Sequence, residues 1–133
     1  MSEPNRFTRT YTAEPGHIDQ LGHVNNTVWV QWIQDMATAH WESVARPQDR
    51  AAFFWVVVRH EIDYRGNIAN GETVTATTWI DGPAQGAKSL RRVEFTDESG
   101  KQLVSASTFW AMIDRASGRL ARVRPEVLAP FHA

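Results

Sequence analysis

One segment of this chain has the apolar pattern of a long helix, and the width of its apolar face limits the folds that can contain it. Residues 26–44 (NTVWVQWIQDMATAHWESV) carry apolar side chains at intervals of three and four. They cover so much of the helix circumference that the helix must be largely buried, with His40 as a core or interface residue. Asn25 or Asn26 suits the N-cap, and Pro47 forbids continuation.

The rest of the chain has the two-residue period and the short turns of β-strands. Alternation or β-branched composition predicts strands at residues 6–13, 53–64, 72–80, 89–96 and 103–113. The short connections between the last four strands favour antiparallel neighbours. We therefore predict an α+β fold in which one antiparallel, five-stranded sheet curls around a long central helix.

Length and composition fit a single domain over residues 1–133. A formal charge of -1 without a basic run argues against a nucleic-acid partner. No apolar run approaches the roughly 20 residues that span a bilayer, and residues 1–10 lack the apolar core of a signal peptide. We expect a soluble, cytoplasmic protein with no membrane partner. Because the chain has no cysteine, a thiolate nucleophile and a Cys-ligated zinc site are excluded.

The segment before the helix, residues 15–26 (PGHIDQLGHVNN), concentrates polar side chains in a Gly-containing loop. Backbone N–H groups at a helix start are unpaired and carry partial positive charge, so they can stabilise a developing oxyanion. Asp19 could supply a carboxylate beside that electrophilic site. This combination predicts the active site of a small acyl-transfer enzyme. The simpler alternative is that Asp19 only caps the loop.

The element at residues 19–26 (DxxGHVNN), followed by an aromatic-rich helix, resembles the acyl-CoA thioesterases of the hotdog superfamily, the 4-hydroxybenzoyl-CoA thioesterase type. Residues 60–64 (HEIDY), 71–72 and 114–119 agree in order and spacing. The resemblance implies a hotdog fold, a homodimer or homotetramer, and active sites between two subunits. It also implies that Asp19 attacks the thioester carbonyl or activates a water. Plant acyl-carrier-protein thioesterases, which are similar, also use a histidine at the position of His23.

The predicted catalytic residues are therefore Asp19, His23 and Asn26. His23 can orient Asp19, donate a hydrogen bond to the acyl oxygen, or merely pack the loop. The loop amides or the Asn26 side chain can polarise the thioester oxygen. Both asparagines also suit capping and left-handed turn conformations, so a capping role alone is the alternative for Asn25 and Asn26.

Substrate binding is predicted for Asn25, Trp29, His60 and Lys88. Lys88 follows a Gly-containing turn and suits a phosphate of CoA, whereas Arg91 and Arg92 can instead protect a solvated edge strand. His60 lies within a strand, where it either lines the pocket or has a structural role.

The leading hypothesis is an acyl-CoA thioesterase that releases a carboxylic acid and free CoA. One alternative is a non-catalytic acyl-CoA-binding module on the same fold, and another is an acyl-thioester dehydratase. His17, Asp19 and His23 are competent metal ligands, but their spacing matches no metal motif. We expect neither a metal nor a cofactor.

Overall fold

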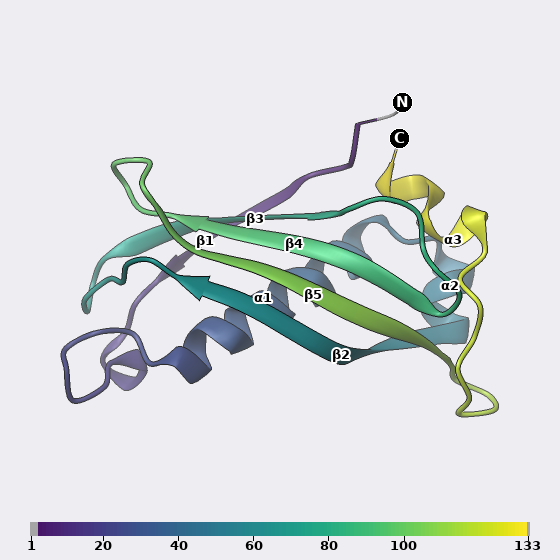
Figure 1. Ribbon diagram of the computed structural model, residues 1–133, viewed down its shortest axis with the longest axis horizontal. Coiled ribbons are helices and arrows are strands. Elements are labelled where there is room, and N and C mark those ends of the chain that lie inside the picture. The colour runs from purple at the N-terminus through teal and green to yellow at the C-terminus, as the bar shows by residue number, and fades with distance from the viewer. Residues whose placement is uncertain (1–2, 133) are drawn as a thin grey trace.

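The computed structural model describes residues 3–132 and contains one long helix and five strands (Figure 1). In chain order the elements are β1 (Phe7–Thr12), a 3-10 helix (Pro15–His17), α1 (Asn26–Val44), α2 (Pro47–Ala52), β2 (Phe53–Tyr64), β3 (Thr73–Ile80), β4 (Lys88–Thr96), β5 (Gln102–Asp114), α3 (Pro125–Leu128) and a second 3-10 helix (Ala129–Phe131). None of the helices in the described part of the chain is long and apolar enough to cross a membrane.

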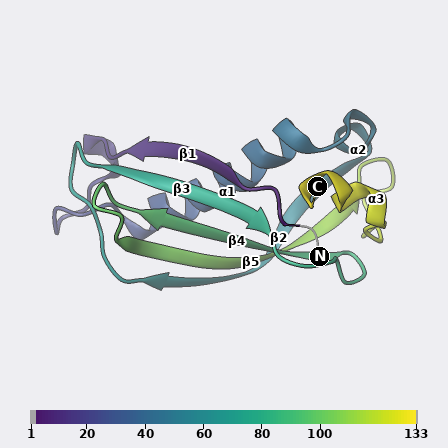
Figure 2. The ribbon, with the colours of Figure 1, turned by 90° about the horizontal axis from the view of Figure 1, so that it is seen from above.

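The strands form one antiparallel sheet in the order β1-β3-β4-β5-β2. The sheet curves around α1, as the two perpendicular views show (Figures 1 and 2). The predicted α+β class, with an antiparallel sheet wrapped around a central helix, is confirmed. β1 and β2 are the edges of the sheet, whereas β4 has a neighbour on each side. The interpretation of Arg91 and Arg92 as edge-strand residues is therefore wrong.

Helix α1 has the predicted bounds, and local chemistry explains them. Asn25 is extended, and its side chain accepts a hydrogen bond from the Thr27 amide. The buried side chains of α1 are those of the predicted apolar face: Trp29, Trp32, Ile33, Met36, Ala37 and His40. Pro47 begins α2, a six-residue helix that the apolar pattern does not predict. Fewer than two helical turns are too short to display a period.

The five strands lie within one residue of their predicted bounds at each end. An irregularity in β2 changes which of its side chains face the helix, because its pairing with β5 shifts between Val57 and Arg59. Phe53 and Trp55 are the more covered positions before this bulge, and His60 and Ile62 are the more covered positions after it.

The core has two apolar parts along α1 with a polar level between them. The first part includes Trp29, Ile33, Met36, Val93 and Phe95. The second includes Ile80, Met112, Val127, Leu128 and Phe131, with Trp41 packed against it. Between them, α1, β4 and β5 each contribute a buried polar side chain, namely His40, Arg91 and Thr108. The interior beneath the second half of the helix is therefore not uniformly apolar.

Candidate active site

The polar loop before α1 folds into a tight turn. Ile18 and Val24 form an isolated antiparallel bridge at its base. The Asp19 amide donates to the His23 carbonyl at 2.8 Å, and the Gly22 amide donates to the Asp19 carbonyl at 3.1 Å. Gly22 has a φ of 81°, a left-handed conformation that glycine adopts without steric cost. The DxxG spacing is therefore, first of all, a turn sequence.

The Asp19 side chain caps this turn with one of its two oxygens. Oδ1 accepts hydrogen bonds from the Leu21 amide at 2.9 Å and from the His23 amide at 3.3 Å. Oδ2 has no hydrogen-bond partner among residues 3–132, and the residue is half-buried. One oxygen thus orients the carboxylate, and the other is available to a substrate or a water.

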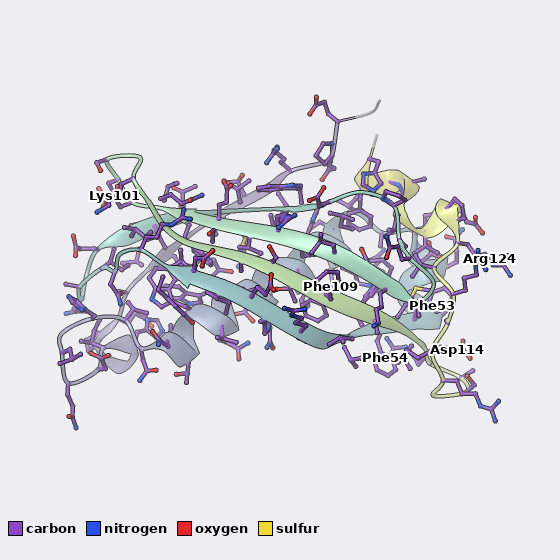
Figure 3. The ribbon with its side chains drawn as sticks, viewed as in Figure 1. Phe53, Phe54, Lys101, Phe109, Asp114 and Arg124 are labelled. Carbon is purple, nitrogen blue, oxygen red and sulfur yellow. The ribbon has the colours of Figure 1, made fainter. Side chains whose placement is uncertain are left out.

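The β4–β5 hairpin, marked by Lys101 in Figure 3, contains a turn with the same hydrogen bonds. Asp97 Oδ1 accepts from the Ser99 amide at 2.9 Å and from the Lys101 amide at 3.0 Å. The backbone bonds also correspond, and Gly100 has a φ of 88°. The local contacts of Asp19 are therefore those of an ordinary capped turn. What distinguishes Asp19 is that its turn leads into the start of α1.

The side chains of His23, Asn25 and Asn26 are all exposed, and among them Asn25 caps the helix. Asn25 Oδ1 accepts from both the amide and the hydroxyl of Thr27, each at 2.9 Å. In the first turn of α1, the Asn26 amide is the donor that has no acceptor among the described residues. Asn25 is therefore committed to the helix start, whereas Asn26 can offer its amide and side chain to a ligand.

His17 is held by the structure around the loop. Its Nδ1 accepts a hydrogen bond from the Glu14 amide at 3.0 Å, and its ring packs edge-on against Trp32. Within residues 3–132, no group of three or more His, Asp or Glu side chains could hold a metal ion.

Trp29 and His60 lie in the interior rather than in the loop. The Trp29 ring is fully buried and packs edge-on against Trp32 and Phe95. His60 Nδ1 shares a 2.8 Å hydrogen bond with Thr108 Oγ1, while its buried Nε2 has no partner among the described residues. Burial lowers the pKa of His60, so its ring is neutral at pH 7. In the described part of the chain, neither the Trp29 nor the His60 side chain forms a hydrogen bond with the polar loop; the Trp29 backbone amide donates to the Asn25 carbonyl at 3.3 Å as part of the helix start.

Lys88 begins β4 at the other end of the molecule. Its side chain is exposed on the outer face of the sheet, because the buried neighbours Ser89 and Arg91 alternate toward the helix. The turn before β4 and the polar loop lie at opposite ends of the molecule in Figure 1. A single chain therefore does not bring Lys88 to the Asp19 carboxylate.

A cavity of about 520 Å³ lies between the second half of α1 and the sheet. Five aromatic side chains line it: Trp41, Phe53, Phe54, Trp55 and Trp110. The exposed charged residues at its boundary are Glu42, Arg50 and Arg115. Tryptophans therefore serve both the core and this pocket.

This cavity and the Asp19 loop lie at opposite ends of α1. Thr38 lines the cavity, and it is twelve residues beyond Asn26, or about 18 Å at the usual rise of an α-helix. Phe53 and Phe54, labelled in Figure 3, mark the cavity end of the molecule. Asp19 does not line the cavity of its own chain.

A network of buried polar side chains borders the cavity. Arg91 Nη1 donates to His40 Nδ1 at 2.8 Å and to Thr78 Oγ1 at 3.1 Å. Because His40 Nδ1 accepts, its proton lies on Nε2, which donates to Asn5 Oδ1 at 2.7 Å. Burial, together with the nearby Arg91 charge, lowers the pKa of His40 to about 3. The prediction that His40 is a satisfied core residue is confirmed.

The buried position of Arg91 at the cavity is not expected from its charge. Two adjacent arginines suggest a solvated strand, but alternation sends them to opposite faces. Arg92, on the outer face, bonds to Asp81 at 2.8 Å. Arg91 has the same parity as Val93 and Phe95, which are core residues. This alternation along the strand is the sequence signal that places Arg91 on the buried face of β4.

This chain is similar in sequence and in structure to known proteins. A family model described as acyl-ACP thioesterase N-terminal domain matches residues 4–131. Among curated proteins, a chloroplastic acyl-(acyl-carrier-protein) hydrolase of Cuphea viscosissima is 29% identical over 73 residues. That alignment covers 55% of this chain and 18% of the relative, so the chain matches only a small part of that protein's length.

Solved structures of low sequence identity share the fold. A hypothetical protein from Staphylococcus aureus, described in complex with CoA, has a TM-score of 0.84 at 16% identity and is covered to 84%, with 98% of this chain aligned. An acyl-ACP thioesterase from Bacteroides thetaiotaomicron has a TM-score of 0.82 at 21% identity and is covered to 54%, with 96% of this chain aligned. The predicted hotdog fold is confirmed.

Proposed function

Because this chain belongs to the acyl-ACP thioesterase N-terminal domain family, we propose that it hydrolyses an acyl thioester with Asp19 as the reacting carboxylate. Water and R–CO–S–CoA would yield a carboxylic acid and the free thiol of CoA. The observation that carries this proposal is the Asp19 carboxylate, oriented through Oδ1 and open at Oδ2, beside the start of α1. The structural neighbour described with CoA supports CoA as the carrier, and the family makes acyl carrier protein the second carrier to test.

Two chemical routes use the same carboxylate. As a nucleophile, Asp19 attacks the carbonyl carbon and expels the thiolate, and water then hydrolyses the mixed anhydride. As a general base, Asp19 takes a proton from a water whose oxygen attacks that carbon. Both routes place negative charge on the thioester oxygen. The Asn26 amide at the positive end of α1, which has no acceptor among residues 3–132, is suited to that charge, and His23 can donate a further hydrogen bond.

In this proposal a second copy of the chain completes the site. β2 is a 12-residue edge strand, on which Val56 and Val58 are 40% and 50% exposed. An edge with exposed apolar side chains is a template for pairing with another chain. Antiparallel pairing of two β2 strands about a two-fold axis would continue the sheet and keep both helices on one face.

That pairing would reverse one copy relative to the other. In each copy, the Asp19 loop and the Tyr64 end of β2 lie at one end, and the Phe53 end of β2 lies with the cavity at the other (Figures 1 and 3). The reversal would bring the loop of one copy beside the cavity of its partner. The acyl group could then enter an aromatic cavity while its thioester meets Asp19 of the other copy.

Replacing Asp19 with Asn tests the proposal. Asparagine keeps an Oδ1 acceptor for the turn, but it can neither attack the carbonyl nor take a proton. We expect kcat to fall by at least about 100-fold. Asp97→Asn makes the same chemical change in the matching turn and should leave kcat unchanged. Thiol release is measured over short, long, branched and aromatic acyl-CoAs and the corresponding acyl carrier protein thioesters.

Wild-type turnover by Asp19→Asn on the best substrate would show that Asp19 is only a turn cap. Tight binding of acyl-CoA without thiol release would indicate the non-catalytic module. Loss of enoyl absorbance on hydration, rather than thiol release, would indicate a dehydratase.

A further inference from the structure

Within residues 3–132, the Arg91 guanidinium is a buried charge without an acidic partner. Arg91 is 6% exposed and lines the 520 Å³ cavity. No Asp or Glu in the described part of the chain forms a salt bridge with it. Burial lowers its pKa to about 9, so it stays charged at pH 7. An unpaired buried charge is costly in free energy, and a protein usually compensates it with an opposite charge.

The neighbours of Arg91 hold it in place without neutralising it. His40 and Thr78 are both neutral acceptors, and both bond to the same nitrogen, Nη1. The low pKa of His40 keeps its ring uncharged. Arg91 Nε and Nη2 make no hydrogen bond among the described residues. The guanidinium is thus oriented on one side and has donors left over.

Two further residues, Ser89 and Trp110, line the same cavity next to Arg91. Ser89 is buried two residues before Arg91 and pairs with Trp110 across β4 and β5. The Trp110 indole N–H is buried and has no acceptor within residues 3–132. The Arg91 guanidinium and the Ser89 hydroxyl therefore border one space, in which no residue among 3–132 supplies an acceptor to Arg91 Nε or Nη2.

The rest of the cavity is apolar and aromatic. Trp41 and Trp55 meet edge-on, with ring centroids 5.5 Å apart, and Phe53 and Ala37 extend this surface. The volume is in the range of small-molecule sites, roughly 300–1,000 Å³. The occupant that matches this chemistry has one anionic group on an apolar body.

We propose that this cavity binds a carboxylate attached to an apolar chain or ring, with the carboxylate oxygens on Arg91 and the apolar part against Trp41 and Trp55. A carboxylate matches the single charge of Arg91, and its two oxygens match the planar fork of a guanidinium. The carboxylate belongs either to a free carboxylic acid or to the far end of a dicarboxylic acyl thioester. The site does not include Asp19 of the same chain, and its binding of an acid does not require hydrolysis.

Calorimetric titration with octanoate and 1-octanol tests the proposal, because the two probes share a chain and differ in charge. Wild-type protein should bind octanoate about 10-fold or more tighter than octanol, as charge-assisted hydrogen bonds predict. Arg91→Met should abolish this preference while retaining octanol binding. Arg92→Gln, on the same strand but on the outer face, should keep the preference.

Equal affinity for the two probes in the wild-type protein, or an undiminished preference in folded Arg91→Met, would overturn the proposal. If Arg91→Met does not fold, Ser89→Ala provides the second variant. It removes the hydroxyl beside Arg91, so it should weaken octanoate binding several-fold without changing octanol binding. Unchanged octanoate affinity in that variant would also count against the site.

Competition between thioesters distinguishes the two sources of the carboxylate. An ω-carboxyoctanoyl-CoA preferred over octanoyl-CoA, with the preference lost in Arg91→Met, assigns the carboxylate to the substrate. Competitive inhibition by octanoate without that preference assigns it to a free acid. This arm rests on the proposed hydrolase function, whereas the titration does not, so failure of hydrolysis alone leaves the binding result interpretable.

Discussion

Among single residues, the interior histidines make stability depend on pH. Burial lowers the pKa of His40 to about 3 and also lowers the pKa of His60. In the unfolded chain a histidine has a pKa of about 6.5. Below that pH the unfolded chain binds more protons than the folded one. The stabilisation is therefore fully present above pH 6.5 and is lost as the pH falls toward the folded pKa.

We predict that the free energy of unfolding falls between pH 7 and pH 5 by up to about 1.4 kcal/mol per pH unit for a fully neutral buried histidine. His40→Gln should show a shallower decline, because glutamine can accept from Arg91 but does not titrate. Urea unfolding at a series of pH values measures both slopes. Equal slopes in the two proteins would mean that His40 protonates in the folded state.

Residue type alone predicts neither the burial of Arg91 nor the chemistry of Asp19. Arginine is a typical surface residue, yet Arg91 is buried because strand alternation and its central strand place it inside. Asp19 has the contacts expected of a turn cap, and Asp97 reproduces them. The contacts of one residue therefore do not identify its chemistry. The element that follows it and the surface that it faces must be considered as well.

For the elements, the start of α1 separates capping from substrate chemistry. We predict that Asn25→Ala lowers the free energy of unfolding by about 1 kcal/mol, because it removes the acceptor for the Thr27 amide and hydroxyl. Asn26→Ala should change stability by less than about 0.5 kcal/mol, since its side chain is exposed and makes no hydrogen bond in the described chain. Chemical denaturation measures both. A larger loss from Asn26→Ala would reverse the assignment of the cap.

For the whole molecule, the two edges of the sheet differ in chemistry. β2 exposes apolar side chains along 12 residues, whereas β1 is six residues long and rich in threonine. The proposed pairing of two copies is therefore expected at β2, which also carries part of the cavity wall. Such pairing would unite the Asp19 loop and the cavity, which one chain holds apart.

We predict that Val56→Lys combined with Val58→Lys converts the proposed dimer to monomers in sedimentation equilibrium and strongly reduces thioester hydrolysis. Lysine on an edge strand opposes pairing through charge repulsion and desolvation. Thr8→Lys combined with Thr10→Lys alters the other edge and should leave both mass and hydrolysis unchanged. Dissociation by the β1 variant alone would place the interface at the wrong edge for the proposed site.

The amino-acid sequence by itself determined the elements and the main candidate loop. The bounds of α1 and the strands follow from side-chain periods of 3.6 and 2, which are local properties of a continuous segment. Asp19, His23, Asn25 and Asn26 are neighbours in the chain, so any compact turn keeps them together. α2 is too short to show a period.

Only the tertiary structure decided which strands are edges, which arginine is interior, and where the cavity lies. It buries the Trp29 ring in the core, places Lys88 at the other end of the molecule from the Asp19 loop, and joins Arg91 to His40, which are 51 positions apart in the chain. These outcomes depend on strand order and on the side of the sheet that α1 covers. Both are set by contacts between segments far apart in the chain, where a local pattern carries no information about the partner.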